Sequence, residues 1–278
     1  MLTFVVPTFN EPESILTASL RAIIDARRPA TPFEIFVVDD STPDREGQVK
    51  AAVAHIAAQL GTDGSIQLLR GPGRGKGAAV RQGALVSRGD IVFLVDADIP
   101  VPLHHIAQFA ALLADGADIV IAERPLSRHT DPVRRMMSRG LLLIQTSIVF
   151  HSLRFKDTQC GFKAFRGDVL RTLAAHQVVE RGMYDLEYLY MAAQAGLVVV
   201  RIPVAANPEI RQSRINVLRC LPRDPYDVLR VKARGVARRL RGIRIAVERE
   251  PLRNDAADAQ NPPKSARIRT SVKPARRL

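Results

Sequence analysis

Two aspartates, Asp96 and Asp98, follow an apolar stretch of this sequence and are separated by one alanine. The five apolar residues 91–95 stand between a Gly-Asp pair and a proline, which predicts a short, fully buried strand. At the carboxyl end of a strand in a parallel sheet, carboxylates lie where open α/β sheets bind ligands. Paired carboxylates suit Mg²⁺ or Mn²⁺, with substrate phosphates and water as further ligands. The pattern therefore predicts a metal site, or alternatively Asp98 caps an apolar-periodic helix that begins near Leu103.

A glycine-rich turn, residues 71–77, is the second stretch with distinctive chemistry. Its backbone N–H groups, with Arg74 and Lys76, suit a polyphosphate. The glycine spacing loosely fits a dinucleotide fingerprint, but that fingerprint follows the first strand of its unit, whereas this turn follows the third predicted strand. A Walker A loop is excluded because Lys76 is followed by Gly77-Ala78 and not by serine or threonine. A polyphosphate site and a structural tight turn with exposed basic side chains both stay open.

The elements that must position these residues alternate between strand and helix. Apolar runs predict strands over residues 2–7, 33–38, 66–70, 91–95 and 118–122, with helices between them. Such alternation predicts an α/β fold with a mostly parallel sheet flanked by helices and right-handed crossovers. Polar residues follow three of these strands: Asn10-Glu11, Asp39-Asp40 and Asp96 with Asp98. Because parallel strands end at one edge of the sheet, we expect these side chains to converge on one ligand.

After Arg124 the pattern becomes less regular. It predicts helices and short strands over residues 133–153 (helix), 162–165 (strand), 184–195 (helix), 197–204 (strand) and 225–247 (basic helix). The composition of the last 25 or so residues, rich in Pro, Ala, Asn, Lys and Arg, predicts a disordered tail. We therefore predict a main α/β domain, a basic amphipathic helical segment and a basic tail over residues 1–216, 217–253 and 254–278.

Composition and charge exclude several classes of protein. No apolar run approaches the ~20 residues that span a bilayer, and no basic region precedes the first apolar stretch as in a signal peptide. Two cysteines provide no disulfide framework, so a reducing cytoplasm is expected. Residues 1–210 hold 22 basic and 22 acidic side chains, whereas residues 211–278 hold 19 and 6 and carry the whole net charge of +13. A neutral body with a basic C-terminal segment indicates an anionic membrane surface or a nucleic acid as partner.

Six motifs resemble, in order and spacing, those of the family 2 glycosyltransferases. They are Val5–Glu11 (VVPTFNE), Val38–Thr42 (VDDST), Arg74–Gly83 (RGKGAAVRQG), Asp96–Asp98 (DAD), Asp157–Lys163 (DTQCGFK) and Tyr184–Glu187 (YDLE). The last two narrow the resemblance to the branch that is similar to dolichyl-phosphate β-glucosyltransferase. The resemblance covers about residues 2–216. It implies a GT-A, Rossmann-like fold, a nucleotide-diphospho-sugar donor, a divalent metal and a polyprenyl-phosphate acceptor.

The resemblance also implies roles for individual residues. The nucleotide-sugar would be bound by ten residues from four motifs: Pro7, Thr8, Asn10, Glu11, Asp39, Asp40, Lys76, Asp96, Ala97 and Asp98. Asp40 would contact the base, and Asp96 and Asp98 would bind ribose, metal and diphosphate. Arg124 matches an arginine that faces the phosphates in relatives, and Arg214 matches a basic residue that would clamp phosphate. Asp157 and Gln159 fall where the family places the acceptor and the reacting sugar.

Elementary chemistry leaves the roles of several acidic residues open. A phosphate monoester has its second pKa near ~6, so a lipid-phosphate acceptor is largely ionised at neutral pH and needs positioning more than a general base. Inverting displacement then depends on the metal bound by Asp98 and on arginines such as Arg124 at the leaving diphosphate. Asp157 is a candidate catalytic base, or it orients sugar hydroxyls or holds its loop. Asp185 and Glu187 either contact the sugar or acceptor, or favour a helix N-terminus through its dipole.

Membrane attachment is expected through the basic segment. Eukaryotic relatives of the glucosyl branch carry an N-terminal anchor, and no such segment precedes the first predicted strand here, so we expect a peripheral protein on the cytoplasmic face of the membrane. Apolar residues at near-helical spacing among arginines predict an in-plane membrane helix, or a basic helix packed on the body: Val228, Leu229, Val231, Val236, Leu240 and Ile243. Residues 141–150 are either a second interfacial element or a core helix.

Two other functions compete with this hypothesis. The first is transfer from the same type of donor to a soluble acceptor, such as a phosphorylated metabolite. The second is nucleic-acid binding, but no nucleic-acid motif accompanies the basic charge, and aromatic residues make up only 5% of the chain, so no nucleic-acid partner is expected. A UDP donor with glucose or N-acetylhexosamine is favoured, while UDP-galactose and GDP-mannose are compatible with the same motifs.

Overall fold

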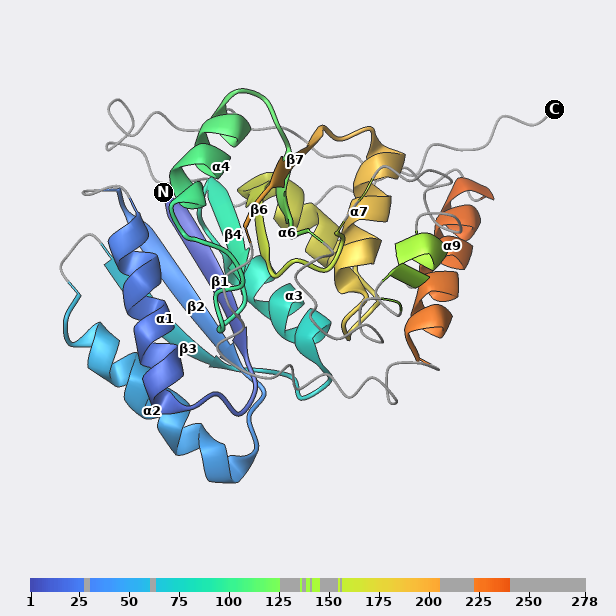
Figure 1. Cartoon of the computed structure of the whole chain (residues 1–278). Coiled ribbons are helices and arrows are strands. Elements are labelled where there is room, and N and C mark those ends of the chain that lie inside the picture. Colours follow the sequence, from blue (N-terminus) through green and yellow to red (C-terminus); the bar gives the residue numbers. More distant parts are fainter. Residues whose placement is uncertain are drawn as a thin grey trace.

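Seven strands form one sheet in the described part of the chain (Figure 1). The computed structural model describes residues 1–27, 31–60, 64–125, 136, 139–140, 142–145, 155, 157–205 and 223–240. The order across the sheet is β3-β2-β1-β4-β6-β5-β7. The strands are β1 (Leu2–Thr8), β2 (Phe33–Asp39), β3 (Gly64–Arg70), β4 (Ile91–Val95), β5 (Ile119–Glu123), β6 (Phe162–Arg166) and β7 (Val199–Pro203).

Helices cover both faces of the sheet, which confirms the predicted α/β class. One face carries α1 (Glu13–Ala26), α2 (Pro43–Ala57) and α4 (His105–Ala114). The other carries α3 (Lys76–Val86), α6 (Gly167–His176) and α7 (Tyr184–Ala195). Helix α6 was missing from the sequence prediction, although its buried apolar residues recur at helical spacing: Val169, Leu170, Leu173 and Ala174.

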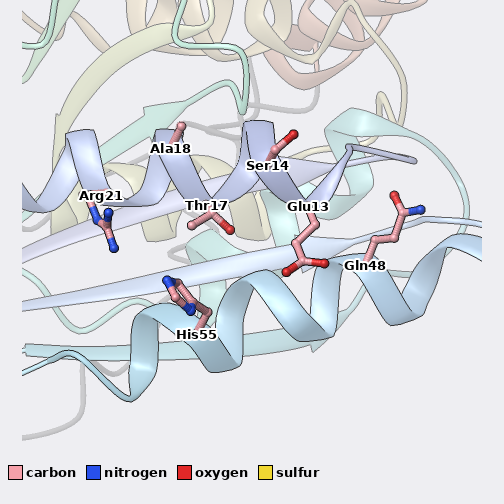
Figure 2. Close-up of a pocket in the computed structure, with 7 residues that line it drawn as sticks. All are labelled: Glu13, Ser14, Thr17, Ala18, Arg21, Gln48 and His55. Carbon is pink, nitrogen blue, oxygen red and sulfur yellow. The ribbon is translucent and has the colours of Figure 1, made fainter.

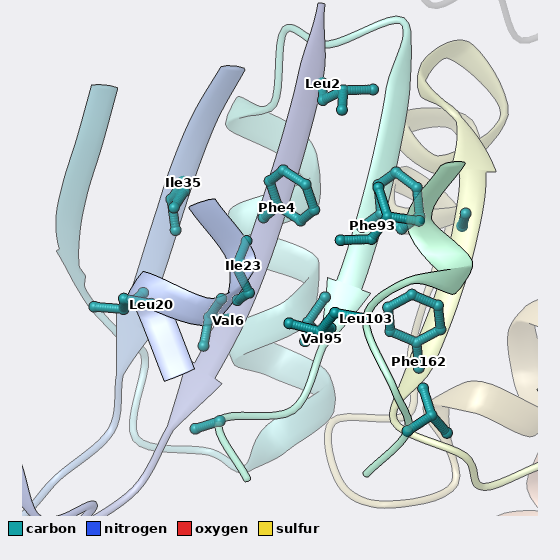
Figure 3. Close-up of a cluster of buried hydrophobic side chains, with 14 of the residues drawn as sticks. Leu2, Phe4, Val6, Leu20, Ile23, Ile35, Phe93, Val95, Leu103 and Phe162 are labelled. Atoms are coloured by element: carbon teal, nitrogen blue, oxygen red, sulfur yellow. The ribbon is translucent and has the colours of Figure 1, made fainter. Parts of the chain in front are cut away.

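Alternation along the central strands explains the two cores. Phe4 and Val6 of β1 lie in the core beneath α1, α2 and α4, whereas Val5 lies in the core beneath α3, α6 and α7. Figure 3 shows the first core, where the Phe4 and Phe93 rings stack with centroids 5.2 Å apart. Because the central strands are buried on both faces, they have the nearly continuous apolar sequence typical of parallel sheets.

Strand β6 runs against all its neighbours. It pairs antiparallel with β4 and with β5, whereas the other strand pairs are parallel. The register places Phe162, the first residue of β6, opposite Val95, the last residue of β4. Residues 157–161 therefore enter the sheet at the same edge at which the parallel strands end.

Helix α9 (Arg223–Leu240) packs on the outer side of α7 (Figure 1). Val228 and Val231 are buried there with Met183, Leu186 and Tyr190 of the α7 region. This contact buries only part of the predicted apolar stripe of the basic helix, because Leu229 and Val236 stay 55% and 43% exposed. The alternative of a basic helix packed on the body is thus correct for the described part of the segment, with a second apolar surface left at its outside.

Some expectations are wrong or lie outside the described residues. Asp98 does not cap the following helix, because α4 begins at His105 after His104 in the N-cap position. Arg214, the tail 254–278, the helix beyond Leu240 and most of the predicted helix 133–153 fall outside the part of the chain that is described. Among the described helices, none is long and apolar enough to cross a membrane.

Candidate active site

The predicted site residues gather at one edge of the sheet. The parallel strands β1, β2 and β4 end there at Thr8, Asp39 and Val95, so the polar residues that follow them share that edge, as predicted. β5 ends at the same edge with Glu123, and Arg124 follows. Pro7 lies within β1, opposite Val38. The reversed strand β6 adds residues 157–161, which the hydrophobic pattern alone did not place at this edge.

Asp39 holds the β1 and β2 loops together. It is 3% exposed, and its Oδ1 accepts hydrogen bonds from the hydroxyl of Thr8 (3.0 Å) and from the backbone N–H (3.1 Å) and hydroxyl of Ser41. Ser41 Oγ in turn accepts the backbone N–H of Asn10 at 2.7 Å, and Asn10 Oδ1 accepts the backbone N–H of Thr42 at 2.9 Å. Because its hydrogen bonds are made inside the protein, Asp39 holds these two loops in a fixed arrangement.

Asp40 keeps one oxygen for a ligand. Its Oδ1 accepts the backbone N–H of Gly73 at 2.7 Å, whereas its Oδ2 is buried and has no hydrogen-bond partner among the described residues. Gly71 makes this approach possible, because a Cβ there would lie 2.1 Å from Oδ1. A buried acceptor without a donor is costly, so this oxygen suits an N–H group of a bound ligand. The glycine turn therefore has a structural role here, and polyphosphate binding by it stays a prediction.

Lys76 and Asp96 form an ion pair in which the ammonium group contacts both oxygens of the carboxylate. Lys76 Nζ lies 2.7 Å from Oδ1 and 2.8 Å from Oδ2 of Asp96. Burial alone would raise the pKa of Asp96, but Lys76, aided by Lys163 and Arg124, lowers it below its ordinary value. Burial would likewise lower the pKa of Lys76, and the charges of Asp96 and Asp185 raise it instead. Both groups are therefore charged at neutral pH.

Gly161 also packs closely against the Asp96 carboxylate. A Cβ at position 161 would lie 1.9 Å from Oδ2 and 2.0 Å from Cγ of Asp96, so only glycine leaves room for this carboxylate. The backbone is tied at the same place, since Asp96 N–H donates to the carbonyl of Gly161 at 2.9 Å. The turn before β6 thus fixes the orientation of the Asp96 carboxylate.

Asp98 is more accessible than Asp96. Burial raises the pKa of Asp98 above its ordinary value, and the negative charges of Asp96 and Glu11 raise it further. No ion pair with Asp98 occurs within the described residues, although the charge of Lys76 partly opposes the rise in its pKa. Ala97 between the two aspartates is buried, and its carbonyl accepts the Ser19 hydroxyl of α1 at 2.6 Å. An acidic residue in such surroundings attracts a cation.

The residues present fit a divalent ion that is completed by a substrate. Within the described residues, no group of three or more His, Cys, Asp and Glu side chains is arranged to hold a metal on its own. Mg²⁺ is commonly bound by one or two carboxylates together with substrate phosphates. Asp98, with its poorly balanced charge, and Asp96, cradled by Gly161, provide such a pair of carboxylates.

A second buried ion pair joins Lys163 of β6 to Asp185 of α7. Lys163 Nζ lies 2.7 Å from Asp185 Oδ1, and the two side chains are 2% and 3% exposed. The two buried charges therefore neutralise each other inside the protein. Burial raises the pKa of Asp185, while Lys163 and Lys76 oppose that rise. Lys163 closes the Asp157–Lys163 motif but had no predicted role, although a lysine in a short apolar strand requires a buried partner.

Arg124 and Asp157 form the third pair. Arg124 Nε donates to Asp157 Oδ2 at 2.8 Å, and Asp157 Oδ1 accepts the backbone N–H of Gln159 at 3.0 Å. Burial would lower the pKa of Arg124, but the neighbouring Cys160 and Asp157 raise it, so the guanidinium stays charged. This geometry favours Asp157 as the group that holds Arg124 and its own loop, and its role as a base stays a prediction.

Glu187 lies apart from this cluster, against the loop that precedes α7. Its carboxylate is 2% exposed and accepts the backbone N–H groups of Val178 (2.9 Å) and Val179 (2.8 Å). In the same loop, Gln177 Nε2 donates to the Gly77 carbonyl at 2.8 Å, and Ala78 N–H donates to the Glu180 carbonyl at 2.9 Å. Glu187 therefore braces a loop that supports the start of α3, and a contact with sugar stays a prediction.

A surface groove lies elsewhere, between α1 and α2 (Figure 2). It is lined by Glu13, Ser14, Thr17, Ala18, Arg21, Gln48 and His55. None of these is a predicted site residue. The sheet edge is therefore the place where the chemically distinctive side chains meet.

Comparisons with known proteins agree with this geometry. Residues 3–159 match the model of the family described as glycosyl transferase family 2. The chain is 31% identical over 234 residues to dolichyl-phosphate beta-glucosyltransferase ALG5C of Trichomonas vaginalis, covering 77% of this chain and 66% of that protein. It is 28% identical over 247 residues to dolichyl-phosphate beta-glucosyltransferase of Dictyostelium discoideum, covering 84% and 74%. The chain thus spans about two thirds to three quarters of the length of these relatives.

Among solved structures, the chain is similar to glucosyl-3-phosphoglycerate synthase from Mycobacterium tuberculosis, crystallised with Mn²⁺, UDP and glucosyl-3-phosphoglycerate. The TM-score is 0.57 at 18% identity, and the match covers 83% of this chain and 78% of that one. A likeness at this identity shows the shared fold.

Proposed function

Because this chain belongs to glycosyl transferase family 2, we propose that it catalyses metal-dependent, inverting transfer of a hexose from a nucleotide-diphospho-sugar to polyprenyl phosphate at a membrane surface. One observation carries the proposal. A single sheet edge carries three kinds of group. They are an unpartnered acceptor for a base (Asp40), a pair of carboxylates for a metal and diphosphate (Asp96 and Asp98), and an arginine held by Asp157 (Arg124). The relatives named for transfer to dolichyl phosphate support the acceptor class.

The donor would enter with its base against Asp40. The free Oδ2 of Asp40 would accept an N–H from the base, a group that uracil offers and that guanine offers as well. UDP is favoured because the structurally similar synthase was crystallised with UDP. Thr8, Asn10 and Asp39 would keep the two loops around the nucleoside in place through the hydrogen bonds that already join them.

The diphosphate would lie over Asp96 and Asp98. A divalent ion held there would act as a Lewis acid that stabilises the charge on the leaving diphosphate. Asp98 would hold this ion, with Asp96 and Glu11 nearby adding negative potential. Lys76, at the N-terminus of α3, would add a positive charge to the diphosphate.

The acceptor phosphate would approach Arg124 and the 157–161 turn. It is already an anion at neutral pH, so Arg124 needs only to position it, and Asp157 needs only to hold Arg124. Asp185, held in place by Lys163, would accept a sugar hydroxyl. Gln159 would contribute to the acceptor side of the site, and Arg214 stays a predicted phosphate ligand outside the described residues.

Membrane attachment would use α9. Tyr226, Leu229 and Val236 expose apolar surface there, and exposed Arg230 and Arg234 add positive charge. A helix with exposed apolar and basic side chains suits the interface of an anionic membrane, where each basic group contributes ~1 kcal/mol. The basic segment 217–253 and tail 254–278 would in this way keep the active site of domain 1–216 at the cytoplasmic surface.

The test is transfer of radiolabelled sugar from a panel of UDP- and GDP-sugars, with Mn²⁺ or Mg²⁺, to undecaprenyl or decaprenyl phosphate. We expect label to move into the organic phase, to depend on the metal and to be lost in Asp98→Ala. Asp115→Ala, which changes an exposed acidic residue at the end of α4, is the matched control and keeps the activity. Label found only on a soluble phosphorylated acceptor such as 3-phosphoglycerate would overturn the lipid acceptor, and transfer in the presence of EDTA would overturn the metal dependence.

A further inference from the structure

The ammonium group of Lys76 contacts the Asp96 carboxylate, which the proposed function assigns to the donor and its metal ion. Nζ of Lys76 lies within 2.7 and 2.8 Å of both oxygens of Asp96, and Gly161 packs closely against the same carboxylate. Asp98, two residues on, has no such partner within the described residues. One of the two acidic groups is thus already neutralised by the protein itself, and the other is not.

The Lys76 side chain is partly exposed, whereas its backbone is held by the loop before α7. The start of α3 is fixed by hydrogen bonds from Gln177 to the Gly77 carbonyl and from Ala78 to the Glu180 carbonyl. The Lys76 side chain, in contrast, is 36% exposed. A lysine is a compact charge on a flexible stem, so its ammonium group changes partner without movement of the helix.

We propose that Lys76 is a stand-in cation: it neutralises Asp96 in the unliganded protein and transfers to the diphosphate when the donor binds, which frees Asp96. This inference rests on the proposed function, because it requires a nucleotide diphosphate and a divalent ion at this edge. Before donor binding, the ammonium group competes with a divalent ion for Asp96. Afterwards the diphosphate provides the ammonium group with an anionic partner and the ion with further oxygen ligands.

The consequence is coupling between the two ligands. A divalent ion alone binds weakly because it must displace Lys76. A nucleotide diphosphate alone also binds weakly, because Lys76 is then paired with Asp96. Each ligand therefore strengthens the other, and linkage requires the same factor in both directions. A permanent structural ion pair makes the opposite prediction, since removing Lys76 would then disorder Asp96 and weaken the binding of the ion.

The experiment measures Mn²⁺ binding by the electron paramagnetic resonance signal of free Mn²⁺, with the full chain, with and without UDP. In Lys76→Met the stem is kept and the charge is lost. We expect the Kd for Mn²⁺ without UDP to fall by about tenfold or more relative to the unmodified protein. The additional tightening caused by UDP should shrink by about the same factor, to what the oxygen ligands of the diphosphate contribute. Lys76→Gln should behave in the same way. Lys50→Met, which removes an exposed lysine of α2 paired with Glu46, is the matched control and changes neither value.

The outcomes separate this inference from the proposed function. If the unmodified protein binds Mn²⁺ tightly with UDP, but both Lys76 variants bind Mn²⁺ without UDP no better than it does, the stand-in role is wrong and the proposed function stands. If the unmodified protein binds no Mn²⁺ even with UDP, the metal site and the inference are both wrong. Thermal unfolding of each variant checks that the fold is kept.

Discussion

Alanine at position 161 should displace the Asp96 carboxylate while leaving the fold intact. The new Cβ would lie 1.9 Å from Asp96 Oδ2 and 2.5 Å from Oδ1. Gly161 does not have a positive φ, so alanine is compatible with its backbone. The backbone cannot retreat easily, because the Gly161 carbonyl accepts the Asp96 N–H at 2.9 Å. The carboxylate is the group that must move.

The size of this movement sets the expected effect. Ordinary contact begins at 3.4 Å, so relieving a 1.9 Å approach moves the carboxylate by about 1.5 Å. A misplacement of ~1 Å in a positioned catalytic group lowers the rate by ~100-fold, or ~2.7 kcal/mol in the barrier. Overpacking typically lowers the free energy of unfolding by ~1–3 kcal/mol, which a folded domain of this size tolerates. We therefore expect kcat/KM of Gly161→Ala to fall by at least ~100-fold in a protein that still folds.

The assay is transfer of labelled sugar to polyprenyl phosphate, with thermal unfolding measured on the same preparations. Gly182→Ala is the matched control, because a Cβ at this glycine would meet nothing within 4 Å. It should keep the activity of the unmodified protein. If Gly161→Ala retained kcat/KM within about threefold, the orientation of Asp96 would not matter for the reaction, and the reasoning from Gly161 would be refuted.

Three further predictions follow from the same contacts. Asp40→Asn should weaken UDP binding by ~10–100-fold, because a charged acceptor contributes ~1.5–3 kcal/mol, whereas the exposed control Asp44→Asn should not weaken it. Equal UDP affinities of Asp40→Asn and the unmodified protein by isothermal titration calorimetry would contradict the base contact. Burial raises the pKa of the Cys160 thiol, so at a given pH less of it is the reactive thiolate. Peptide mapping should therefore show slower alkylation of Cys160 by iodoacetamide than of a free cysteine, and rapid labelling of Cys160 in the folded protein would contradict this prediction. Leu229→Glu should weaken binding to anionic vesicles, measured by cosedimentation, by about tenfold, because it removes exposed apolar surface and adds a repelled charge. Leu85→Glu on α3 should not weaken this binding, and unchanged binding of Leu229→Glu would argue against α9 as the membrane contact.

Most of the scaffold was predictable from local pattern. The apolar runs that became β1, β2 and β4 end in polar residues, and parallel strands must end at one edge, so Asp40, Asp96 and Asp98 were expected to meet. Helix α6 was not predicted, although its buried apolar residues recur at helical spacing in the sequence. The apolar residues of α9 were recognised, but the pattern does not say which of them a neighbouring helix covers, and α7 covers Val228 and Val231.

The partners of the charged residues were not predictable in the same way. Sequence motifs single out Lys76, Asp96 and Asp185, yet nothing local indicates that Lys76 pairs with Asp96 or that Asp185 pairs with Lys163. Glu187 illustrates the limit of a motif, because its carboxylate binds backbone N–H groups of the loop before α7. Ion pairs of this kind join residues from different elements, and their choice depends on which charges the packed core brings together.

The sequence by itself determined the α/β class, the strands with their polar ends and the acidic residues at Asp96 and Asp98, because hydrophobic period and chain direction are local properties. Only the tertiary structure decided that β6 runs antiparallel between β4 and β5. A strand has the same hydrophobic period in either direction, and its neighbours are chosen by packing over the whole sheet. That reversal brings Gly161 against Asp96 and Asp157 to Arg124, and so completes the candidate site.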